Sequence, residues 1–235
     1  MTETNSTNTT DHAHSEFPLQ LEIYSDIACP WCYLGLTRFF LAYDASPLVG
    51  RMPIRFRSYQ LDPSTPKEEP RPHREVLAAK FRTTVDQVDQ MHQRIADMGS
   101  AVGLHYNFGA VRGVNTFDGH RLIHLGETHG LARATKLALL RAYFEDGASL
   151  TDPITLRDIG RSVGLDDSLV SEMLASDQYA DAVRHDIELA SHYGITGVPT
   201  FLFLFDADHY ALSGAQEVEV FTQVLDKLFL LVSEG

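Results

Sequence analysis

The chain has 235 residues, and its hydrophobic fraction of 44% is enough for one large domain, or one domain with an insertion, to bury a core. The formal net charge of −13 argues against nucleic acid as a partner, because its phosphates are neutralised by Lys and Arg. The same charge disfavours binding to anionic membrane surfaces.

The N-terminal segment, residues 1–16, is polar and rich in Thr, Asn and Ser. It has neither the basic region nor the apolar region of a secretory signal, so we expect a disordered tail and a cytoplasmic protein. We also expect no membrane span, because no stretch approaches about 20 consecutive apolar residues.

A β-α-β unit is predicted next. Residues 19–25 alternate apolar side chains as a buried strand does, residues 33–45 form an apolar helical stretch, and residues 54–61 form a second strand. Cys29 and Cys32 therefore stand at the turn from the first strand into the helix.

The middle of the chain is predicted to be helical. Four prolines make residues 62–72 a connection. Apolar residues then recur every three to four positions over residues 85–102, and Thr84 with Gln87 resembles a capping box. Further helices are expected at about 116–129, 132–146, 155–163, 166–175 and 180–190.

Strands return near the end of the chain. Residues 200–205 are an apolar run, residues 206–208 a turn, residues 210–213 the partner strand, and residues 218–232 a closing helix. The simplest layout is a mixed α/β sheet with a large all-helical insertion.

Cys29 and Cys32 are the only cysteines, and only Pro30 and Trp31 separate them. A disulfide across so small a loop removes little freedom from the unfolded chain, so the spacing favours a dithiol that opens and closes. At a helix N-terminus the dipole stabilises a thiolate, and Pro30 fits the first helical turn.

A metal site is the alternative use of two cysteines. Structural zinc needs two further ligands, and His120 with His124 could share a helix face. The eleven histidines are scattered and no second cysteine pair exists, so we expect no bound metal.

The segment GITGVPT, residues 194–200, places Pro199 at the entry of an apolar strand. Standing alone, an ordinary trans proline would explain it. Combined with the cysteine pair and the order of elements, it predicts a cis bond between Val198 and Pro199.

Together these features resemble the DsbA-like family of the thioredoxin superfamily, with a helical insertion in a thioredoxin-like sheet. Local strings resemble its FrnE branch over residues 19–231: Ser25-Asp26 ahead of CPWCYLG, Asn115-Thr116-Phe117-Asp118 with His120-Arg121, GITGVPTF, and Ser213-Gly214-Ala215-Gln216. The implied domains are a thioredoxin-like domain (17–61 and 177–235) and a helical insertion (62–176).

The resemblance implies roles for the central residues. Cys29 would be the exposed nucleophile, Cys32 the buried resolving thiol, and the backbone of Val198 beside Pro199 would pair with an extended substrate. Trp31 either shapes the substrate surface together with Pro30 or covers the thiols.

The chain departs from DsbA at two positions. Ile23 stands where DsbA has an acidic residue, and Trp31 stands where DsbA has a histidine. Because the oxidising power of DsbA rests on a stabilised reduced form, we expect a less oxidising couple here.

Supporting roles for three residues stay open. Asp26 could accept a proton near the thiols, but we favour the interpretation that it caps the following helix. His120 and Arg121 either face the site or form a pair on the helix surface.

The predicted activity is thiol–disulfide exchange with thiol- or disulfide-containing proteins or glutathione, with no bound cofactor. One alternative is a glutathione-dependent enzyme of the kappa transferase or hydroxychromene-carboxylate isomerase type, which the family resemblance implies would carry serine at the Cys29 position. Another is a peptide-binding chaperone module without redox activity. A homodimer is left open.

Overall fold

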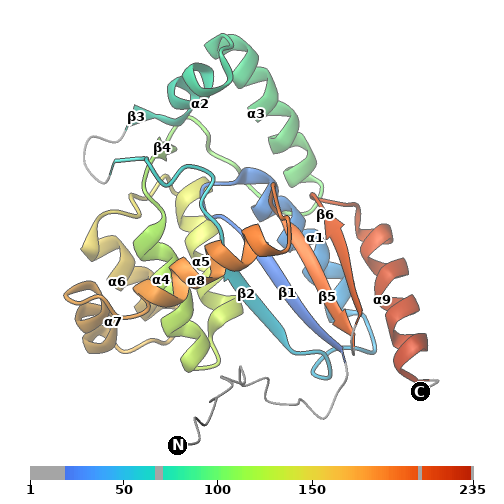
Figure 1. Ribbon diagram of the computed structural model, residues 1–235. Helices are drawn as coiled ribbons and strands as arrows, with labels where there is room; N and C mark the ends of the chain where they lie inside the picture. The colour runs from blue at the N-terminus through green and yellow to red at the C-terminus, as the bar shows by residue number, and fades with distance from the viewer. Residues whose placement is uncertain (1–18, 67–70, 206–207, 234–235) are drawn as a thin grey trace, which may run out of the picture.

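The computed structural model describes residues 19–66, 71–205 and 208–233 of the chain. Its centre is a mixed four-stranded sheet in the order β2-β1-β5-β6, with β1 parallel to β2 and antiparallel to β5 (Figure 1). The strands are β1 (Leu19–Ser25), β2 (Ile54–Ser58), β5 (Thr200–Phe205) and β6 (Asp208–Ser213). The predicted mixed α/β fold with a thioredoxin-like sheet is confirmed.

Helices surround this sheet and fill the long segment between β2 and β5. They are α1 (Pro30–Asp44), α2 (His73–Phe81), α3 (Val85–Ser100), α4 (Phe117–Thr128), α5 (Ala132–Phe144), α6 (Pro153–Ser162), α7 (Asp167–Leu174), α8 (Ala180–His192) and α9 (Val218–Ser233). Figure 1 shows α4 to α7 grouped beside the sheet, with α2 and α3 projecting above it. Two short strands, β3 (Arg71–Pro72) and β4 (Arg112–Gly113), pair at the base of that projection.

The two faces of the sheet bury different side chains. Leu21 and Ile23 of β1 belong to the large apolar core that α1 and α9 complete. On the opposite face, Tyr24 of β1 and Leu202 of β5 pack with Ala190 of α8. Because both faces are covered, β1 is buried at every position except Gln20.

Most predicted elements are confirmed, and several differ. β3 lies within the connection predicted over residues 62–72, and β6 begins at Asp208, inside the predicted turn. The strand predicted over residues 54–61 ends at Ser58, and α2 was not predicted because it buries only His73 and Ala78 and so lacks an apolar stripe. The capping box at Thr84 is present, with both hydrogen bonds made to Gln87.

Other predictions fall outside what the structure tests. The tail over residues 1–16 and most of the turn at 206–208 lie outside the described residues. The domain boundaries stay a prediction, and the large core runs without a break from β1 and α1 into α4 to α7. In the described part of the chain, no helix has the length and apolar character to cross a bilayer.

Candidate functional site

The helix α1 begins at the cysteine pair. Cys29 is its N-cap residue, Pro30 occupies the first helical turn, and the amide of Cys32 donates to the Cys29 carbonyl at 3.0 Å. Proline fits there because its missing N–H would have no helical partner. The thiol of Cys29 thus stands at the positive end of the helix dipole, as predicted.

The Cys29 thiol lies against the loop before β5. The Val198–Pro199 peptide is cis, which confirms the prediction, and Cys29 Sγ lies 3.6 Å from the Val198 carbonyl oxygen. The expectation of an exposed Cys29 was wrong, since the residue is only 3% exposed. The contact with the Val198 carbonyl is one that this buried sulfur makes.

Cys32 is fully buried, as expected of a resolving thiol, and both cysteines are free. Burial raises the pKa of the Cys32 thiol, and the adjacent Cys29 raises it further. The charge of Lys136 and a hydrogen bond from the Asp26 backbone N–H oppose this rise in pKa. The second sulfur is therefore placed to react with its neighbour rather than with solvent.

Asp26 is buried beside the thiols rather than capping α1. Its carboxylate accepts from the Leu61 amide at 2.8 Å and lies 3.3 Å from His120 Nε2, whereas the N-cap position belongs to Cys29. Burial alone would raise the pKa of Asp26, but hydrogen bonds led by that from His120 hold it below its usual range. The capping interpretation was wrong because this side chain turns inward to α4.

His120 is also buried, at 1% exposed, so the surface-pair alternative does not hold. Burial lowers the pKa of its imidazole, and because the ionised Asp26 can only accept, Nε2–H is the donor. Arg121 is buried too, but it donates to the carbonyls of Met173, Ser176 and Gln178 and so does not face the thiols.

Lys136 of α5 is the residue of this site that the sequence analysis missed. It is 1% exposed, and its Nζ donates to the Ser25 carbonyl at 3.2 Å. Burial lowers the pKa of Lys136 to about 8, while Cys32, Asp26 and Cys29 act to raise it. A buried ammonium group thus lies near the cysteine pair, whose thiols act on its pKa.

Of the two residues between the cysteines, Pro30 is half-buried and Trp31 is exposed. Trp31 is 40% exposed, so part of its side chain is available to a substrate. The Pro30 carbonyl accepts a hydrogen bond from the Tyr106 hydroxyl at 2.7 Å, which ties the start of α1 to the segment after α3.

A cavity of about 290 Å³ is lined by Ala28, the residue before Cys29, although neither cysteine is among the described residues that line it. Val76, Leu77 and Val114 supply apolar walls, and Asp62 and Lys80 also line it. The cavity is therefore suited to an apolar side chain.

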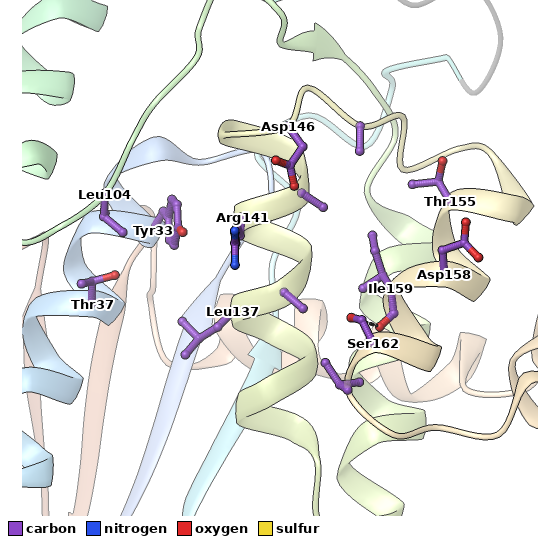
Figure 2. Close-up of a pocket in the computed structure, with 14 residues that line it drawn as sticks. Tyr33, Thr37, Leu104, Leu137, Arg141, Asp146, Thr155, Asp158, Ile159 and Ser162 are labelled. Carbon is purple, nitrogen blue, oxygen red and sulfur yellow. Dashed lines mark hydrogen bonds between the residues drawn. The ribbon is translucent and has the colours of Figure 1, made fainter.

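A second cavity, of about 740 Å³, lies where α1, α5 and α6 meet (Figure 2). Tyr33 is the lining residue that is nearest in sequence to the cysteines, and neither thiol is among the described residues that line this cavity. Figure 2 shows Arg141 and Asp146 of the α5 region on one side and Asp158 of α6 on the other.

The two histidines considered as metal ligands serve separate networks. His120 contacts Asp26, whereas His124 Nε2 lies 3.0 Å from Asp186 Oδ2. Within the described ranges, no cluster of three or more His, Cys, Asp or Glu side chains is arranged to hold a metal ion.

The family of DSBA-like thioredoxin domains matches this chain over residues 20–226. A solved structure from Streptomyces coelicolor, described as a "probable DsbA oxidoreductase", is 38% identical and has a TM-score of 0.83, with 90% of each chain covered.

More distant structures share the fold. The cytosolic disulfide reductase DsbM from Pseudomonas aeruginosa, also solved with glutathione, is 18% identical with a TM-score of 0.64 over 90% of this chain and 99% of its own. A 2-hydroxychromene-2-carboxylate isomerase is 17% identical with a TM-score of 0.67 over 92% of this chain and 98% of its own.

Proposed function

The chain belongs to the family of DsbA-like thioredoxin domains, and from this membership we propose that it is a thiol–disulfide oxidoreductase whose redox pair is Cys29 and Cys32. The observation that supports this most is the pair itself: one free thiol at the N-terminus of α1 beside the Val198 carbonyl, and a second free thiol buried one helical turn further.

In the reducing direction, the Cys29 thiolate attacks a substrate disulfide and releases one substrate thiolate. The Cys32 thiolate then attacks Cys29 in the mixed disulfide, so that the Cys29–Cys32 bond forms as the second substrate thiolate leaves. In the oxidising direction, a substrate thiolate attacks Cys29 of the disulfide and Cys32 leaves. A second substrate thiolate then releases reduced enzyme.

The surroundings of Cys29 support an extended polypeptide as substrate. Val198 would pair through its backbone with the substrate, in the manner of β-strand addition, with Pro30, Trp31 and Pro199 around it. The substrate must gain access to Cys29, which is 3% exposed and whose sulfur contacts the Val198 carbonyl. We place the side chain that adjoins the substrate cysteine in the 290 Å³ cavity beside Ala28.

The activity is tested with insulin reduction and with reactivation of scrambled ribonuclease. We expect Cys29→Ser to abolish both activities and Cys32→Ser to accumulate mixed disulfides with substrate, because only the resolving step is lost. Full activity of the Cys29→Ser variant would contradict the proposed exchange function and favour the chaperone alternative.

The redox potential tests how this chain compares with DsbA. Trp31 is the only tryptophan and lies between the cysteines, so its fluorescence reports their state in a glutathione titration. We expect a potential below the value of about −120 mV for DsbA, and a value at or above it contradicts the expectation.

Glutathione is the small-molecule redox partner that we propose. DsbM, which was solved with glutathione, shares the fold, and so does the 2-hydroxychromene-2-carboxylate isomerase. The resolving thiol Cys32 favours exchange over glutathione conjugation. Binding of glutathione together with turnover of chlorodinitrobenzene would support the transferase alternative instead.

We further propose a cytoplasmic location and membership in the FrnE branch. The location is supported by the fold shared with cytosolic DsbM, and the branch by the local strings around Cys29, His120 and Pro199. Fractionation of the native host with an antibody to the protein tests the location.

A further inference from the structure

One peptide group connects a buried lysine to the resolving thiol. Lys136 Nζ donates to the carbonyl oxygen of Ser25, and the N–H of the next residue, Asp26, donates to the Cys32 sulfur. These two hydrogen bonds use opposite ends of the same peptide group. A cation at its oxygen polarises the group and strengthens its N–H as a donor, because hydrogen bonds in a chain reinforce one another in a low-dielectric interior.

The thiolates of the cysteine pair can balance the positive charge of Lys136. Cys29 and Cys32 face it from α1, Asp26 from the turn after β1, and His120 from α4. Among the described ion pairs, the partner of Asp26 is His120 rather than Lys136. A buried ammonium is costly without compensation, and negative charge on a thiolate supplies it.

This arrangement differs from the one that the family resemblance implies. Ile23, at the position of the acidic residue of DsbA, is an apolar core residue. Near the thiols of this chain, Asp26 supplies a negative charge, and Lys136 on α5, a helix from the inserted half of the chain, supplies a positive charge.

We propose that Lys136 is a positioning residue for the resolving step, holding negative charge on Cys32 through the Ser25–Asp26 peptide. The inference rests on the proposed exchange function. In that step the Cys32 thiol releases its proton to solvent, and the thiolate attacks Cys29 of the mixed disulfide. The bond between Cys32 and Cys29 forms, the bond to the substrate sulfur breaks, and the substrate leaves as a thiolate that takes up a proton.

A chromogenic disulfide separates the two steps. When reduced protein reacts with dithiobis(nitrobenzoate), attack by Cys29 releases one nitrothiobenzoate ion and attack by Cys32 releases the second. We expect Lys136→Met to slow the second release about tenfold at neutral pH and to raise its pH midpoint by about one unit, with the first release changed less than about twofold. The matched control is Arg141→Met, which removes an exposed cation from the same helix and should leave both releases unchanged.

Two outcomes of this experiment are decisive. An unchanged pH midpoint for the second release in Lys136→Met overturns the role of Lys136, while the exchange function stands. If the wild-type protein releases no second ion, the exchange function fails, and the role of Lys136 fails with it.

The wild-type protein gives an independent test if Lys136→Met does not fold. The chain has four lysines, so the Lys136 side chain can be followed by carbon NMR in labelled protein. Coupling between sites is reciprocal, so the Lys136 titration must move to lower pH when the cysteines form a disulfide and the thiolate disappears. If Lys136 titrates at the same pH in the reduced and the oxidised protein, the inference is overturned.

Discussion

Gly35 of α1 lies against Pro199 of the loop that contacts Cys29. A Cβ atom at Gly35 would come within 2.9 Å of Pro199 Cγ and within 3.2 Å of the Ala215 backbone. Only a hydrogen at this position lets the helix that carries the cysteines approach the loop so closely. The sequence feature that fixes this approach is therefore a glycine three residues after Cys32.

The Gly35→Ala variant tests this packing. In an open helix the change would stabilise by about 1 kcal/mol, because alanine has the higher helix propensity. Here we expect a net loss of about 1–3 kcal/mol of unfolding free energy, since overpacking displaces the loop. Urea unfolding of the reduced protein measures this loss, and insulin reduction should slow in parallel as the Val198 backbone leaves the position in which it would pair with the substrate.

Gly197→Ala is the matched control in the same loop. No atom lies within 4 Å of a Cβ built at Gly197, so the unfolding free energy should change by less than about 1 kcal/mol. Equal stability losses in both variants would show that the loss in Gly35→Ala does not arise from the close contact between α1 and Pro199.

Local patterns predicted much of the fold correctly. β1 and β5 have the predicted bounds because each is an apolar run beside turn residues, and the Thr84 capping box is a signal contained in four residues. The helix α2 was missed because the exposed positions outnumber the buried ones, and its place is set by packing against α3 and β4.

The candidate site likewise contains residues that local patterns predict and residues that only long-range contacts bring together. The cysteine motif and Pro199 are local signals, whereas Asp26 meets His120 across 94 positions and Lys136 meets Ser25 across 111. No spacing rule connects residues so distant. A signal for Lys136 did exist, because it shares a helix face with Leu139, Leu140 and Tyr143, which are all buried.

Buried His73 should make the fold sensitive to acid. Burial lowers its pKa from 6.5 to about 4, so the folded state binds fewer protons than the unfolded chain between these values. The stability that depends on neutral His73 is fully present above pH 6.5 and is lost as the pH falls to about 4, by on the order of 3 kcal/mol. Chemical denaturation at a series of pH values measures this slope.

His73→Phe isolates the contribution of this residue. The ring that stacks on His92 is kept, with ring centres 5.4 Å apart in the native pair, while the titrating group and its unpartnered Nδ1 are removed. We expect a shallower loss of stability from pH 6.5 to 4 than in the wild type. Identical slopes would assign the acid sensitivity to other groups.

His124 should act in the opposite sense. Burial alone would lower its pKa, but hydrogen bonds to Asp186 and Glu127 outweigh burial and raise the pKa to about 9. Its contribution is therefore full below the unfolded value of 6.5 and is lost as the pH rises to about 9, by on the order of 3 kcal/mol. We expect His124→Asn to remove this alkaline loss, and His185→Asn, on the exposed face of α8, to retain it.

The 290 Å³ cavity should discriminate between large and small substrates. Leu77→Trp adds an indole to its α2 wall, where we place the side chain adjoining the substrate cysteine. Because one filled subsite is worth about 1–3 kcal/mol, insulin reduction should fall at least about tenfold. Reduction of oxidised glutathione should change less than about twofold, since this small disulfide reaches Cys29 without occupying the cavity.

A matched tryptophan on the surface distinguishes this effect from general damage. Ile154 on α6 is 65% exposed, so Ile154→Trp adds the same bulk away from the thiols and should leave both rates unchanged. Thermal unfolding of Leu77→Trp identifies any loss of fold. If both substrates slow equally in a folded Leu77→Trp protein, the cavity does not contribute to substrate selection, because an effect on Cys29 itself would be independent of substrate size.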